Sequence, residues 1–172
     1  SSIMAAEAIR LTVANLKKAL DNPEDIEARS AMAWANTLAG IAISNGGTIA
    51  IHGMAHPIGG HTDAPHGATL SAVAPAILSY TWKGNPKVYA DLAKLLGAAD
   101  DDEETLAAGC GETLRSFLRS VGQDVSVGSL GVTREMIPTL AEDAFFTMSG
   151  AMGNTWMQLS VEDAIKMYEM AL

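Results

Sequence analysis

All four histidines of the chain fall in one short segment. His52, His56, His61 and His66 lie in a stretch that also contains several prolines and glycines. His52 and His56 are four residues apart, so on a helix their imidazoles project from one face, one turn apart. Imidazole binds zinc, iron and copper ions, and it also exchanges protons near neutral pH. The segment therefore predicts a metal site or a catalytic site, with a purely structural role as the alternative.

The residues between the histidines indicate how the segment folds. Pro57 and the pair Gly59-Gly60 come directly after His56, so we expect the helix carrying the first two histidines to end soon after His56. Pro65 is typical of the first turn of a further helix. His66 would then lie near a helix start, folded back toward the preceding helix. Two neighbouring helices would each present imidazoles to one site.

Two other metal sites are not favoured. A zinc protease helix carries Glu directly after the first histidine of His-Glu-x-x-His, where it acts as the general base. Gly53 occupies that position here, so this reading is excluded. The acidic run Asp100–Glu104 precedes an apolar helical pattern, and acidic residues are common at helix N-termini because they interact favourably with the helix dipole.

Composition excludes several classes of protein. The 172 residues are 48% hydrophobic and 18% charged, as expected for one globular domain with a substantial core. A net charge of −9 argues against binding to nucleic acid, whose phosphates would be repelled. The single cysteine, Cys110, cannot form an internal disulfide and falls in an apolar helical stripe, where we expect it to be buried and inert. No signal peptide and no membrane-length apolar run is visible, so we predict a cytoplasmic protein without a membrane partner.

Hydrophobic periodicity predicts an all-α bundle of about seven to nine helices. The Ala-rich second helix, ending near Ser44, is apolar on nearly every side and is expected at the centre of the bundle. Thr133 is expected to cap a helix that continues through Met148, and Gly150–Leu159 are expected to be irregular. Ser160 and Asp163 form the pattern of a capping box for the last helix. The other expected helices cover Met4–Leu20, Ala68–Trp82, Val88–Leu96 and the stretch from the acidic run to Val121.

The histidine segment closely resembles the signature of the iron-containing (group III) alcohol dehydrogenases. The resemblance rests on His52-Gly-Met-Ala-His56-Pro-Ile-Gly-Gly, followed by Asp63-Ala-Pro-His66-Gly. Further stretches similar to the family lie on both sides, so the resemblance covers essentially the whole chain. These stretches are Thr37–Ala42, Asn45–Gly47, Leu130–Val132, Ile137–Ala144 and Ser160–Ala164.

The resemblance implies a fold and a domain organisation. Residues 1–172 would form a single helical metal-binding domain, like the C-terminal domain of the iron-containing alcohol dehydrogenase and dehydroquinate synthase-like fold. Members of this family also have an N-terminal dinucleotide-binding domain with a Gly-Gly-Gly-Ser phosphate loop. They carry an Asp-x-x-x-His pair that supplies two more metal ligands. Neither feature is found in this sequence.

The resemblance also implies roles for individual residues. His52 and His66 match two metal ligands of the family, with Fe²⁺ as the expected ion and Zn²⁺ as an alternative. His56 matches the histidine that lies near the nicotinamide and the substrate, and it would be both a proton-transfer residue and a cofactor contact. His61 matches no fixed role and is expected in a surface loop, with a contact to the metal ligands or to the cofactor as the alternative. Asp63 is expected to cap a helix or shape a turn rather than bind the metal.

The function implied is an oxidoreductase that interconverts alcohols and aldehydes or ketones, with NAD or NADP as the hydride carrier. We expect a homo-oligomer, and we expect the isolated chain to be inactive because the cofactor domain is lacking. Two alternatives stay open. One is a related reductase such as a maleylacetate reductase, although those enzymes tend to replace the His-Gly-Met and Pro-His-Gly elements. The other is a non-catalytic helical fragment that self-associates.

Overall fold

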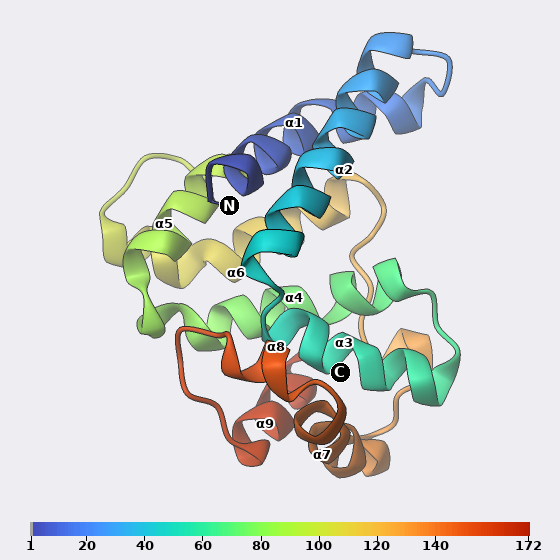
Figure 1. Ribbon diagram of the computed structural model, residues 1–172, viewed down its shortest axis with the longest axis vertical. Helices are drawn as coiled ribbons and strands as arrows, with labels where there is room; N and C mark the ends of the chain where they lie inside the picture. The colour runs from blue at the N-terminus through green and yellow to red at the C-terminus, as the bar shows by residue number, and fades with distance from the viewer. Residues whose placement is uncertain (1) are drawn as a thin grey trace.

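A computed structural model describes residues 2–172, and all regular structure within them is helical (Figure 1). The all-α prediction is therefore confirmed. The α-helices are α1 (Ser2–Asp21), α2 (Ile26–Gly46), α3 (Ala50–Thr62), α4 (His66–Thr81), α5 (Pro86–Leu95), α6 (Glu103–Ser120), α7 (Ile137–Thr147), α8 (Ser149–Gly153) and α9 (Val161–Ala171). Three short 3-10 helices join them: η1 (Trp82–Gly84), η2 (Gly128–Leu130) and η3 (Arg134–Met136). None of the helices in residues 2–172 has the length and apolarity needed to cross a bilayer.

Helix α4 lies at the centre of the molecule and belongs to both of its apolar cores. Val73 and Ile77 pack into the larger core, which α4 shares with α3, α7 and α9. Leu78 packs into the smaller core, together with residues of α5 and α6. The sequence of α4 is apolar on all sides because helices cover it from several directions. This helix begins at His66, so one end of the candidate site is anchored in the most buried element.

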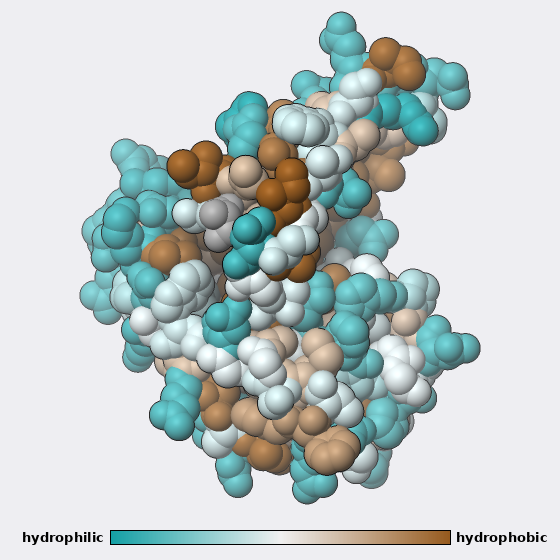
Figure 2. Space-filling model, viewed as in Figure 1, coloured by the Kyte–Doolittle hydropathy of each residue, from teal (hydrophilic) through white to brown (hydrophobic). Residues whose placement is uncertain are grey.

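Helices α1 and α2 form a hairpin that projects from the rest of the molecule (Figure 1). The prediction that α2 lies at the centre of the bundle is wrong. Its small side chains Ala28 and Ala35, together with Leu38, are buried, but its opposite side is open. Trp34 is 55% exposed and Ile43 is 46% exposed, and Figure 2 shows apolar residues gathered on this hairpin. The apolar composition of α2 therefore marks a helix whose second face is uncovered in residues 2–172.

Three element boundaries differ from the sequence-based expectation. Helix α3 continues through Pro57 to Thr62, instead of ending soon after His56. Thr133 precedes the 3-10 helix η3 and its side chain makes no capping bond, so α7 starts only at Ile137. Part of the segment expected to be irregular forms the short helix α8. The capping box of Ser160 and Asp163 at the start of α9 is present as expected.

Candidate metal and catalytic site

Helix α3 presents His52 and His56 on one side because its other side is deeply buried. Met54, Ala55 and Ile58 have no exposed surface and pack into the larger core. Pro57 is also buried. A proline inside a helix removes one hydrogen bond, and the burial of Pro57 and Ile58 offsets this loss, so the helix does not break. His52 is partly exposed and His56 is exposed, one turn apart.

A tight turn after α3 reverses the chain and places His66 beside the first two histidines. Asp63 adopts the left-handed conformation, with φ of 59°, and its N–H donates to the carbonyl oxygen of Gly59. Asp63 is thus the C-cap of α3, as the sequence indicated. Pro65 then precedes the first residue of α4, which is His66. Proline fits this position because the first N–H groups of a helix have no partner within the helix.

The three imidazoles of His52, His56 and His66 lie close together. The ring centroids of His52 and His66 are 5.5 Å apart, those of His56 and His66 are 5.0 Å apart, and those of His52 and His56 are 6.5 Å apart. Two imidazoles that bind one ion at the usual Zn–N distance have centroids about 5 Å apart. The fold thus brings together rings from two helices at separations that suit shared ligation.

The environment of His52 favours its neutral form. Burial, followed by the neighbouring imidazoles of His66 and His56, lowers the pKa of His52 below its usual value of 6.5. A proton on His52 would lie in a partly desolvated place beside two further groups that can become cationic. A neutral imidazole has a lone pair available for a metal ion. The electrostatics of the cluster therefore match the donor role that the sequence suggested for His52.

The histidine cluster fits part of a metal site. Within residues 2–172, no group of three or more His, Cys, Asp or Glu side chains is arranged to hold one ion. The chemistry of the donors nevertheless suits a divalent transition metal, because imidazole nitrogen binds both Fe²⁺ and Zn²⁺. His66 and His56 are exposed, so their side of the cluster is open to further ligands.

His61 lies apart from this cluster. It is in the last turn of α3 rather than in a surface loop, which corrects the sequence-based expectation. Its Nε2 atom is 2.7 Å from Oδ2 of Asp143 on α7, and both side chains are more than a third exposed. This pair connects the end of α3 to α7.

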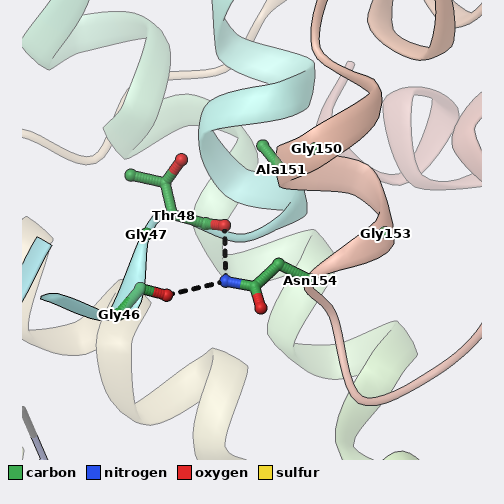
Figure 3. A pocket seen from close by; sticks show the side chains of 7 residues that line it. All are labelled: Gly46, Gly47, Thr48, Gly150, Ala151, Gly153 and Asn154. Carbon is green, nitrogen blue, oxygen red and sulfur yellow. Dashed lines mark hydrogen bonds between the residues drawn. The ribbon is translucent and has the colours of Figure 1, made fainter. Parts of the chain in front are cut away.

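Residues far along the chain hold the start of α3. Asn154 donates from Nδ2 to the carbonyl oxygens of Gly46, at 2.9 Å, and Thr48, at 3.1 Å (Figure 3). Thr155 accepts at Oγ1 from the backbone N–H of Ala50, at 3.0 Å. A pocket lies between this turn and α8, lined mostly by glycines (Figure 3). Sequence reasoning missed Asn154 and Thr155, because their partners are more than a hundred residues away and no local pattern marks them.

Known proteins share sequence and fold with this chain. The hydroxyacid-oxoacid transhydrogenase of Xenopus tropicalis, described as mitochondrial, is 34% identical in an alignment 157 residues long that covers 83% of this chain and 34% of that protein. An archaeal halo-thermophilic alcohol dehydrogenase from a Red Sea brine pool superposes with a TM-score of 0.93 at 32% identity, covering 98% of this chain and 44% of that one. The maleylacetate reductase of Agrobacterium tumefaciens superposes with a TM-score of 0.83 at 25% identity, covering 99% of this chain and 45% of that one.

The chain thus spans 34% of the length of its first curated relatives and less than half of the similar solved chains. The family match covers every residue: positions 1–172 fit the description "Fe-containing alcohol dehydrogenase family, C-terminal". These matches show that the chain belongs to the C-terminal part of the iron-containing alcohol dehydrogenase family.

Proposed function

We propose that this chain is the metal-binding helical part of an NAD(P)-linked, metal-dependent alcohol dehydrogenase that interconverts alcohols and aldehydes or ketones. The observation that carries the proposal is the gathering of His52, His56 and His66, from two helices, with ring centroids within 6.5 Å. Membership of the family supports the same reaction class.

In this proposal His52 and His66 hold the metal ion, which is Fe²⁺ or alternatively Zn²⁺. The metal, when bound, supplies Lewis acidity toward the substrate oxygen. His52 comes from the first turn of α3 and His66 from the start of α4, and the buried faces of both helices fix the two rings relative to each other. The lowered pKa of His52 keeps its ring neutral at physiological pH, which metal binding requires.

His56 is the proposed catalytic residue and a contact for the nicotinamide. It is exposed, and its ring centroid is 5.0 Å from that of His66, so it faces the same space as the proposed ligands without being buried behind them. An exposed imidazole at this position can give a proton to the substrate oxygen or take one from it. Because His56 is exposed, the planar nicotinamide ring has room to lie against its imidazole.

Other parts of the reaction are proposed to come from outside residues 1–172. The relatives are about two to three times longer than this chain. A dinucleotide-binding domain would hold NAD or NADP, and an Asp-x-x-x-His pair would supply two further ligands. Hydride transfer depends on holding the nicotinamide against the substrate, and such positioning contributes on the order of 7–11 kcal/mol in favourable cases. We therefore expect the isolated 172-residue chain to show no dehydrogenase activity.

Metal titration tests the ligand assignment. The chain is treated with EDTA, dialysed, and titrated with Zn²⁺ by calorimetry. We expect weak binding that is lost in His52→Ala and in His66→Ala. Binding should persist in His61→Ala, because His61 pairs with Asp143 away from the cluster. Equal affinity in all four proteins would reject the ligand assignment.

Reconstitution tests the reaction. The chain is mixed with a separately expressed N-terminal part of a relative, and reduction of NAD and NADP is followed with simple primary and secondary alcohols. We expect activity only in the mixture, and we expect His56→Ala to lower kcat more than it lowers metal affinity. Activity of the chain alone, above that of the His52→Ala/His66→Ala double variant, would contradict the divided-site proposal.

A second candidate function is self-association through α2. The exposed residues Trp34, Ile41 and Ile43 of this helix favour it, because exposed apolar patches of this kind mark interaction surfaces. Sedimentation at several concentrations would reveal a dimer, and a monomer at high concentration would argue against it.

A homo-oligomer and a cytoplasmic location remain part of the proposal. The intact His-Gly-Met and Pro-His-Gly elements favour an alcohol dehydrogenase over a maleylacetate reductase.

A further inference from the structure

Helix α3 begins without a cap of its own. The residue before it is Ile49, which is extended and has no side-chain oxygen to accept a hydrogen bond. The first N–H groups of any helix need partners outside the helix. The N–H of Ala50 finds one in Oγ1 of Thr155, at 3.0 Å, although these residues are 105 positions apart. Thr155 therefore acts as the N-terminal cap of α3, a role that a neighbouring Ser or Thr in the sequence often has.

Asn154 holds the turn that leads into α3. Both hydrogen bonds of its side chain leave from the same amide nitrogen and reach the carbonyl oxygens of Gly46 and Thr48 (Figure 3). These carbonyls flank Gly47, which has a φ of +70°. A Cβ at Gly47 would lie 3.3 Å from Nδ2 of Asn154, so the amide sits directly against this backbone. The side chain of Asn154 therefore holds this turn through its backbone carbonyl groups.

The neighbouring helix α8 packs directly beside His52. A Cβ at Gly53 would lie 2.5 Å from the sulfur atom of Met152, so the absence of a side chain at Gly53 lets Met152 approach α3. Both residues are buried. Three residues thus contact α3 around His52. Asn154 holds the turn before the helix, Thr155 binds its first residue, Ala50, and Met152 packs against Gly53, the residue after His52.

From these contacts we infer that Asn154 and Thr155 are positioning residues for the imidazole of His52. His52 is the third residue of α3, and its N–H is bonded to the carbonyl oxygen of Ile49, at 2.9 Å. A shift of this first turn moves the His52 ring relative to His66, which is anchored separately at the start of the central helix α4. The inference rests on the proposed function, in which His52 and His66 share one ion.

The test is the Zn²⁺ affinity of the 172-residue chain, measured by calorimetry, with two substitutions that preserve size. Thr155→Val removes the oxygen that accepts from Ala50. Asn154→Asp removes the amide nitrogen that donates to the two carbonyls. Substitution of groups that orient metal ligands typically lowers metal affinity about 10–100-fold, and we expect a loss of at least about tenfold in each variant.

Matched controls separate positioning from a general loss of stability. Thr113→Val and Asn15→Asp remove side-chain bonds to helix carbonyls in α6 and α1, which do not carry the histidines. We expect them to leave Zn²⁺ affinity unchanged. Thr155→Ser keeps the hydroxyl and should restore the affinity lost in Thr155→Val. Amide hydrogen exchange should accelerate in residues 49–53 of Thr155→Val, with the core of α4 still protected.

Each outcome decides the inference. Unchanged Zn²⁺ affinity in Thr155→Val and Asn154→Asp, with binding still lost in His52→Ala, would overturn it while leaving the proposed function intact. Unchanged affinity in His52→Ala itself would reject the proposed function. Failure of Thr155→Val to unfold cooperatively, or failure of Thr155→Ser to restore binding, would assign Thr155 a general structural role and also overturn the inference.

Discussion

The hydroxyl of Tyr168 donates a hydrogen bond to the backbone carbonyl oxygen of Met54, at 2.6 Å. Both residues are fully buried. This bond connects the last helix, α9, to α3 at a point between His52 and His56, close to the place where Pro57 removes a bond within the helix. The C-terminal helix therefore supports the part of α3 that carries the candidate site.

Tyr168→Phe should destabilise the fold by about 0.5–1.5 kcal/mol, the usual net contribution of such a hydrogen bond. The ring stays in place, so packing is nearly unchanged. Burial, together with the carboxylate of Asp143, raises the pKa of Tyr168, so the hydroxyl remains a donor at all ordinary pH values. Urea unfolding followed by circular dichroism measures the change. A variant as stable as the parent would show that the bond contributes nothing to folding.

Two glycines of α6 should respond in opposite ways to substitution by alanine. Gly109 faces open space, and a Cβ added there would have no neighbouring atom within 4 Å. Alanine is the better helix former by about 1 kcal/mol, so Gly109→Ala should raise the free energy of unfolding. At Gly111 a Cβ would overlap Oγ of Ser79 and the backbone carbonyl oxygen of Pro75 on α4. Gly111→Ala should therefore lower stability by about 1–3 kcal/mol, because two helix backbones are forced apart.

Gly109→Ala and Gly111→Ala serve as controls for each other, since both changes add one methyl group to the same helix. Thermal or urea unfolding of the two variants gives the comparison. A result in which both variants gain stability would mean that α4 and α6 are not in close contact at Gly111. The glycine at that position would then reflect no steric requirement.

Acidification should destabilise the chain partly through His52. The pKa of His52 is lowered in the folded chain, chiefly by burial and then by His66 and His56. Below the unfolded value of about 6.5 the unfolded chain therefore binds more protons than the folded one. The contribution of His52 to the free energy of unfolding is fully present above pH of about 6.5, and it is lost as the pH falls toward the pKa of His52 in the folded chain. His52→Gln should make the free energy of unfolding depend less steeply on pH in that window.

The measurement is urea unfolding at several pH values between neutrality and about pH 5, spanning the titration of a normal histidine, with EDTA present to exclude metal ions. His61→Gln is the matched control. Its imidazole lies 2.7 Å from the carboxylate of Asp143 and outside the histidine cluster, so this variant measures the effect of removing an imidazole elsewhere on α3. An unchanged slope in His52→Gln would show that the histidine cluster does not oppose protonation of His52.

Asp163 should be the most important residue at the start of α9. Its Oδ2 accepts from the N–H and the hydroxyl of Ser160, and its Oδ1 accepts from the hydroxyl of Tyr80. The hydrogen bond from Tyr80 is the main cause of the lowered pKa of Asp163. Asp163→Ala should cost about 1–2 kcal/mol, because the cap and the contact to α4 are lost together. Glu162→Ala, at an exposed position in the same turn, should cost less than about 0.5 kcal/mol.

Local sequence patterns were sufficient for the all-α fold class and for the common face of His52 and His56. Periodicity and stop residues predicted an all-α chain, and the pair Ser160 and Asp163 predicted the capping box that the structure contains. The burial of Cys110 was also predicted correctly, and burial raises the pKa of its thiol to about 12. The four-residue spacing of His52 and His56 determined their common face. These features depend on residues within a few turns of one another, where helix geometry is the same in every protein.

The tertiary structure decided what the local signals could not. Pro57 predicted an early end to α3, but burial of Pro57 and Ile58 against the core outweighs one missing hydrogen bond, and the helix continues to Thr62. The apolar sequence of α2 predicted a central helix, although only one of its faces is covered in residues 2–172. The cap that Thr155 provides for Ala50 joins positions 105 residues apart. No pattern along the chain marks such a contact, because it exists only once packing has brought α3 and α8 together.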